Sequence, residues 1–132
     1  MKRVVLDASA VMTFFEDRRG ADKVEELISV AVASKRELLM SVVNWGEVYY
    51  SVWRAKGQGA AQKAGAEIAQ LPIEVVPADF EMTRLAATFR ANHKLMYADC
   101  FAAALASARR ALVVTADADF KTVAKDVQVL FL

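Results

Sequence analysis

Asp99 is the only charged residue between Leu95 and Ala108, in the stretch LMYADCFAAALASA. A helix that is apolar on every side is normally buried, and a buried carboxylate without a partner usually takes up a proton. Capping of the helix start would explain this acid in part, because helix N-termini favour negative charge. No Lys or Arg stands next to Asp99 in the sequence, so a metal ion explains the carboxylate better.

Further acids stand directly after apolar runs that resemble strands. Asp7 follows the run VVL, and Asp117 and Asp119 follow the run LVVT. Each of them, taken alone, is explained as a helix N-cap, which is a common role for Asp. The segment TADADF nevertheless contains two acids and a Thr, which is more polar side chains than a single helix cap requires.

Glu47 lies in the first turns of another predicted helix. It either pairs with Arg54 in solvent or, together with Asn44, lines a cleft. The opposite face of this helix carries an apolar stripe at helical spacing, and we expect that stripe to be core or interface. Its aromatic members are Trp45, Tyr49 and Trp53.

The acids together point to metal chemistry. Clustered carboxylates repel, and without a cation at least one of them would take up a proton. Ligand sets made only of oxygen select Mg²⁺ or Mn²⁺ rather than Zn²⁺. Such an ion polarises a phosphoryl oxygen and lowers the pKa of a bound water, which indicates phosphodiester hydrolysis. His93 is the only histidine, in the charged segment RANHKL, and we expect it on the surface.

The elements that must position these acids alternate between strand-like and helix-like patterns. This alternation predicts an α/β fold whose parallel sheet is covered on both faces. In such folds ligands bind beyond the carboxyl ends of the strands, where Asp7 and Asp117 stand. The predicted strands are 4–6, 38–43, 73–76, 112–115 and 127–132, and the predicted helices are 8–15, 21–33, 44–56, 60–70, 79–92, 97–109 and 119–125.

Composition limits the remaining possibilities. The 132 residues suffice for one domain, and the single cysteine, Cys100, excludes a disulfide framework and favours a reducing, cytoplasmic setting. No apolar run approaches the roughly 20 residues of a membrane helix, so no membrane contact is expected. The net charge of +1 means that nucleic acid would be bound by a local patch, for which Arg18 and Arg19 are candidates.

The acidic segments resemble those of PIN-domain ribonucleases, and most of all the VapC toxins of toxin–antitoxin pairs. The opening VVLDASAVMTFFEDRRGADKVEELI resembles the first motif of that family and the helix pair that follows it. SVVNWGEVYY resembles the segment with its Glu, LMYADCFAAALA the segment with its third acid, and LVVTADADF its last motif. The segments come in family order and span nearly the whole chain.

The resemblance implies a fold, a reaction and partners. The fold is a PIN-like three-layer α/β/α domain, residues 1–132, with a central, mainly parallel sheet of about five strands. The reaction is Mg²⁺- or Mn²⁺-dependent cleavage of RNA through a metal-activated water, and the partners are a VapB-like antitoxin and a second copy in a homodimer. The implied catalytic residues are Asp7, Glu47, Asp99 and Asp117, with Asp7, Asp99 and Asp117 as metal ligands, Glu47 and Asp119 as alternative ligands, and Ser9, Asn44 and Thr115 as supporting groups.

Three other classes of protein share parts of this pattern. A haloacid-dehalogenase-like phosphatase needs a second Asp two residues after the first, where this chain has Ser9. A phospho-receiver domain needs an Asp after the third strand, where this chain has Val76 and Pro77. A catalytically silent PIN-like binding module remains as an alternative, although all four acids are present.

Overall fold

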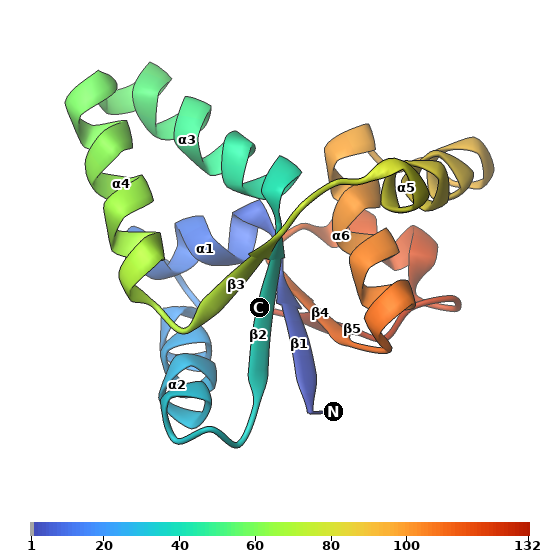
Figure 1. The fold of residues 1–132 in the computed structure, drawn as a ribbon, viewed down its shortest axis with the longest axis horizontal. Coiled ribbons are helices and arrows are strands. Elements are labelled where there is room, and N and C mark those ends of the chain that lie inside the picture. The colour runs from blue at the N-terminus through green and yellow to red at the C-terminus, as the bar shows by residue number, and fades with distance from the viewer. Residues whose placement is uncertain (1) are drawn as a thin grey trace.

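A single parallel sheet forms the centre of the computed structural model, which describes residues 2–132 (Figure 1). Its strand order within these residues is β3-β2-β1-β4-β5, which confirms the predicted fold class. All of the pairs are parallel, with Val5 of β1 opposite Leu39 of β2 and Val113 of β4. The strands are β1 (Arg3–Leu6), β2 (Glu37–Ser41), β3 (Ile73–Val76), β4 (Leu112–Thr115) and β5 (Val129–Phe131).

Helices cover both faces of the sheet. Figure 1 shows α1, α2 and α4 on one side and α5 and α6 on the other, with α3 rising beyond the sheet to pack against α4. The helices are α1 (Ala8–Phe15), α2 (Ala21–Val32), α3 (Val42–Lys56), α4 (Gln58–Gln70), α5 (Phe80–Asn92) and α6 (Tyr97–Arg109), and a 3₁₀ helix, η1 (Ala118–Val123), follows β4.

The central strand divides its side chains between two cores. Val5 packs with α5, α6 and η1 on one face, while Val4 and Leu6 pack with α1 to α4 on the other. These three side chains are at most 1% exposed, as expected for a strand that is buried on both faces. Successive side chains of a strand point to opposite faces, so each one enters one of the two cores. The residue that follows β1 then lies at the carboxyl edge of the sheet.

Several predicted boundaries differ from those observed, among them the last strand, which is Val129–Phe131 rather than 127–132. The sequence predicted a strand over 38–43, but β2 ends at Ser41 because its hydroxyl accepts a hydrogen bond from the Val43 amide (3.2 Å) and caps α3. Val42 and Val43 therefore begin a helix in spite of their β-branched side chains. The predicted helix over 119–125 is the shorter η1, capped by Asp117.

Helix α6 is buried along most of its length, as its sequence predicts. The residues from Cys100 to Ala106 are all buried, and four of them are alanines that let the helix lie close to the sheet. None of the helices formed by residues 2–132 combines the length and apolarity that a membrane crossing requires.

Candidate functional site

Asp7 is fixed at the end of the central strand by hydrogen bonds to both carboxylate oxygens. Oδ1 accepts from the Ala10 amide (2.8 Å) and the Ser9 hydroxyl (2.7 Å), and Oδ2 accepts from the Thr115 hydroxyl (2.5 Å). Asp7 is therefore the N-cap of α1, but it is also 1% exposed and held from a second strand. Because Oδ1 already has two donors, Oδ2 is the oxygen with a lone pair to spare.

Ser9 and Thr115 connect the ends of neighbouring strands β1 and β4. Their hydroxyl oxygens lie 3.1 Å apart, and both are closer to Asp7 than to each other. Each hydroxyl has one proton, so both donate to Asp7 and accept from the loop after β4. The Ser9 hydroxyl accepts from the Ala116 amide and the Thr115 hydroxyl from the Asp117 amide, each at 2.9 Å. This arrangement positions the segment that carries Asp117.

Asp117 and Asp119 have different structural roles. The Asp117 carboxylate accepts from the Asp119 amide (2.8 Å) and so caps η1, which is the capping role that the sequence allowed. Asp119 lies in the first turn of η1 and is exposed, whereas Asp117 is half-buried.

Asn44 joins Glu47 to the helix that carries Asp99. Its amide nitrogen donates to Glu47 Oε1 (2.8 Å) and to the Ala98 carbonyl (3.0 Å). Asn44 is 0% exposed, so this contact fixes the N-terminal turns of α3 and α6 against each other. The solvent pairing of Glu47 with Arg54 is wrong, since Arg54 lies over the Tyr50 ring at 5.4 Å.

Asp99 lies in the first turn of α6 but does not cap it. The N-cap is Met96, so Asp99 makes no capping hydrogen bond, although it lies in the first turn, where a helix favours negative charge. Burial raises the pKa of Asp99 to about 7, helped by the charges of Glu47, Asp117, Asp7 and Asp119. The charge of every other acid in the predicted set therefore raises the pKa of Asp99.

The other acids show the same mutual repulsion. Burial raises the pKa of Asp7 to about 6, against the lowering effect of its hydrogen bonds from Thr115, Ala10 and Ser9, and Glu47 adds to the rise. Burial likewise raises the pKa of Glu47, with a further contribution from Asp117. The sheet topology therefore gathers Asp7, Glu47, Asp99 and Asp117 at its carboxyl edge.

The donor set fits a hard divalent cation. It consists of carboxylate oxygens whose charges oppose one another, and the buried Oδ1 of Asn44 has no hydrogen-bond partner beside them. Within residues 2–132, however, no three Asp, Glu, His or Cys side chains are grouped closely enough to hold an ion as they stand. An ion would have to draw the carboxylates together.

Two residues singled out in the sequence lie in other surroundings. The Arg18 guanidinium pairs with Glu16 in the turn after α1, with Nε–Oε2 at 2.9 Å. His93 is half-buried rather than on the surface, with Nε2 3.2 Å from Asp126 Oδ2. Sequence reasoning had no signal for the contact of Asn44 with Ala98, because these residues are 54 positions apart.

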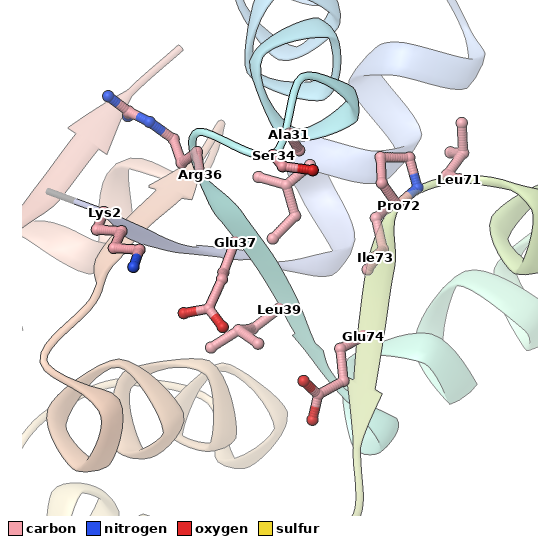
Figure 2. Close-up of a pocket in the computed structure, with 11 residues that line it drawn as sticks. Lys2, Ala31, Ser34, Arg36, Glu37, Leu39, Leu71, Pro72, Ile73 and Glu74 are labelled. Atoms are coloured by element: carbon pink, nitrogen blue, oxygen red, sulfur yellow. The ribbon is translucent and has the colours of Figure 1, made fainter.

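A hollow of about 470 Å³ lies at the opposite edge of the sheet (Figure 2). It is lined by residues around the amino ends of β2 and β3, where Glu37 and Glu74 project from neighbouring strands. None of the gathered acids lines it. In an open parallel sheet, a site is expected at the carboxyl edge, so this hollow is not the candidate centre.

Comparisons with known proteins agree with this fold. A chain of VapBC2 from Rickettsia felis, solved bound to a DNA fragment from its promoter, superposes with a TM-score of 0.77 at 16% identity, covering 98% of each chain. A chain of DNA-bound VapBC from Salmonella typhimurium gives 0.74 at 15% identity, covering 99% of this chain and 98% of that one. VapC20 from Mycobacterium tuberculosis, described as a Sarcin-Ricin loop cleaving toxin, gives 0.71 at 18% identity, covering 94% and 95%.

The sequence itself is matched at the level of the family. No curated protein matches the chain significantly. The PIN domain family model matches residues 4–126, a range that contains every acid of the gathered set. The chain therefore belongs to the PIN domain family.

Proposed function

We propose that the chain is a Mg²⁺-dependent endoribonuclease of the VapC type, with Mn²⁺ as an alternative ion. The observation that carries this proposal is the placement of Asp7, Glu47, Asp99 and Asp117 at strand ends and helix starts on one edge of the sheet, where burial and the other carboxylates raise the pKa of Asp99. Carboxylates kept together against their repulsion are expected where a cation neutralises them. When bound, the ion would supply a Lewis acid that polarises a phosphate group and lowers the pKa of a water molecule.

The residues of the chain divide into ligands and positioning groups. Asp7 would offer Oδ2, because Ser9 and Ala10 already use Oδ1. Asp99 and Asp117 would complete the ligand set, with Glu47 and Asp119 as further candidates. Asn44 directs Glu47 by holding Oε1, which leaves Oε2 facing away from that bond. Thr115 and Ser9 keep Asp7 and the Asp117 segment in register.

The geometry disfavours a haloacid-dehalogenase-like phosphatase. That class of enzyme needs a second Asp two residues after the first. Ser9 stands at this place, and its hydroxyl donates to Asp7 Oδ1 (2.7 Å), so the second carboxylate is missing. A catalytically silent PIN-like binding module remains as the alternative that an activity assay distinguishes.

The test is cleavage of single-stranded RNA of mixed sequence by the purified protein in Mg²⁺, in Mn²⁺ and in EDTA. We expect cleavage in either ion and none in EDTA. Asp99→Asn should abolish it, while the matched variant Asp79→Asn should not, because Asp79 is an exposed N-cap of α5 and Asn caps equally well. Absence of cleavage in both ions would leave the binding-module alternative.

We further propose that a VapB-like antitoxin segment covers the arm formed by α3 and α4. A hollow of about 300 Å³ between α1, α3 and α4 is lined by Met12, Phe15 and Val52, among others. Trp53 of the aromatic stripe is 44% exposed, so α4 does not cover the stripe fully, and the neighbouring Tyr50 is 50% exposed. Replacing Val52 by Asp should release a co-expressed antitoxin without loss of RNA cleavage.

The homodimer implied by the resemblance is a separate proposal. Large apolar side chains are exposed on surfaces that the antitoxin would not need to cover, among them Phe80 at 80%. Exposed apolar area of this kind favours association. Light scattering on the purified chain should give twice the mass of the 14.5 kDa protomer, and a monomer mass at all concentrations would refute the dimer.

A further inference from the structure

A hollow of about 220 Å³ opens beside the acidic site, between the end of α5 and η1. Arg90, Lys94 and Met96 line it together with Asp119, and the buried side chain of Leu95 contributes to its wall. Its charged groups are two cations and one carboxylate. The acidic site next to it therefore has a neighbour of the opposite net charge.

Both cations of the hollow are open to a ligand. Arg90 and Lys94 are exposed, and neither forms an ion pair with any carboxylate of the part of the chain that the structure describes. Arg90 makes one long hydrogen bond, 3.5 Å from Nη1 to the His93 carbonyl. A guanidinium and an ammonium group side by side are the donors that bind phosphate oxygens in proteins.

The hollow also adjoins the helix turn that carries Asp99. Arg90 lies in the last turn of α5, and Lys94, Leu95 and Met96 belong to the connection that leads into α6. Met96 is the N-cap of α6, and Asp99 lies in the first turn of that helix. Asp119 lines the hollow from η1, which Asp117 caps. The hollow therefore borders the segments that carry Asp99 and Asp117.

We propose that Arg90 and Lys94 bind a backbone phosphate of the RNA strand, next to the phosphate that is cleaved. This inference rests on the ribonuclease function proposed above. Acids and an ion would act on one phosphate. The two cations, which Asp119 balances only in part, would hold the neighbouring phosphate and fix the register of the strand. Met96 and Tyr97, 72% and 48% exposed, offer apolar surface to the base attached there.

The hollow of Figure 2 provides a matched comparison. It too contains one Lys and one Arg, but there Lys2 and Arg36 share the space with Glu37 and Glu74, so their charges are compensated. It lies at the amino ends of the strands, away from the acids. The double variant Lys2→Gln with Arg36→Gln removes two positive charges, as many as Arg90→Gln with Lys94→Gln, but at the other edge of the sheet.

The experiment measures binding of a short fluorescein-labelled single-stranded RNA in EDTA, where no cleavage occurs, as a function of salt. For single strands each phosphate contact contributes about 0.7 to the slope of log K against log salt. The slope of the Arg90 and Lys94 variant should be smaller by about 1.4. When salt rises from about 50 to about 200 mM, the factor by which its affinity falls should therefore be roughly sevenfold smaller than for the wild type. The Lys2 and Arg36 variant should keep the wild-type slope.

Cleavage in Mg²⁺ gives a second, separate readout. The Arg90 and Lys94 variant should raise KM and leave kcat within about twofold, because the cations bind the strand rather than the reacting atoms. If these cations only complement the dipole of α5, the variant would melt at a lower temperature with an unchanged salt slope, and the proposal would be overturned. An equal loss of slope in both variants, or loss of antitoxin binding instead of RNA binding, would also overturn it.

The two proposals fail in different ways. If the wild type and the Arg90 and Lys94 variant differ in salt slope as expected but the wild type cleaves no RNA in Mg²⁺ or Mn²⁺, the phosphate subsite is supported and the ribonuclease is refuted. If the wild type cleaves RNA and the variant has the same KM and the same salt slope as the wild type, the ribonuclease is supported and the subsite is refuted.

Discussion

Replacing Asp7 by Asn should stabilise the metal-free protein above neutral pH. Asp7 is 1% exposed, and burial raises its pKa from 3.8 to about 6. One pKa unit corresponds to 1.36 kcal/mol, so ionised Asp7 destabilises the folded state by about 3 kcal/mol. Asn has the same shape without the charge: its oxygen can accept the bonds from Ser9 and Ala10, and its amide can donate to Thr115.

The pH window of this effect follows from the direction of the shift. Below pH 3.8 the Asp7 carboxyl is protonated in both the folded and the unfolded chain, so wild type and variant should be about equally stable. Between about pH 4 and pH 6 the folded state keeps a proton that the unfolded state has lost, and wild-type stability falls as the pH rises. Above about pH 6 the full difference is present.

The assay is urea unfolding in EDTA at about pH 8 and about pH 4, followed by the fluorescence of Trp45 and Trp53. At the higher pH we expect Asp7→Asn to be more stable than the wild type by about 2–3 kcal/mol. Addition of Mg²⁺ should stabilise the wild type only, because the variant lacks the ligand oxygen charge. The exposed cap variant Asp79→Asn should match the wild type under each condition.

One result would refute this reasoning. If Asp7→Asn is less stable than the wild type at about pH 8 in EDTA, the hydrogen bonds from Thr115, Ala10 and Ser9 favour the ionised carboxylate more strongly than burial disfavours it. Asp7 would then be a structural cap with a low pKa, and repulsion within the site would no longer argue for an ion.

Three further predictions concern other parts of the molecule. Asp99→Asn should abolish Mg²⁺-dependent RNA cleavage and leave the metal-free melting temperature equal or higher, and wild-type cleavage at saturating Mg²⁺ would rule out the ligand role. Gly65→Ala should destabilise by about 1 kcal/mol in urea, because its Cβ would lie 3.3 Å from an indole carbon of α3, whereas Gly59→Ala, with nothing within 4 Å, should not. Replacing Arg18 and Arg19 by Gln should lower the RNA salt slope by about 0.7 rather than 1.4, because Arg18 is already paired within its own turn, and an unchanged slope would make both ordinary solvated residues.

The sequence was sufficient for the architecture because local and tertiary preferences agree there. The run before Asp7 is apolar at every position, and the structure buries it on both faces as the central strand. The predicted end of the second strand was wrong because one polar side chain outweighed the strand propensity of the residues after it. Ser41 ends β2 and starts α3, although the following Val42 and Val43 favour a strand.

The positions of the acids at one edge of the sheet were predictable from the sequence, but their hydrogen-bond partners were not. Asp7, Asp99 and Asp117 could be identified because strand ends and helix starts meet at one edge of a parallel sheet. Whether a carboxylate caps its helix depends on backbone geometry, which is why Asp117 caps η1 and Asp99 caps nothing. The basic pair Arg90 and Lys94 gave no signal, since a charged helix end is usually a solvated surface.

The buried Oδ1 of Asn44 indicates why the site is built at the expense of stability. An unpaired buried acceptor costs about 1–3 kcal/mol, and a hydrophobic residue at this position would avoid that loss. The same side chain, however, holds Glu47 and the Ala98 carbonyl, so removing it would free two elements of the acidic edge. The folded chain tolerates the orphaned oxygen and the opposed carboxylates because Val4, Val5, Val113 and Val114 beneath them are all 0% exposed. The cation proposed above should neutralise the opposed carboxylates, so its binding should stabilise the folded domain, and metal binding and folding should be thermodynamically linked.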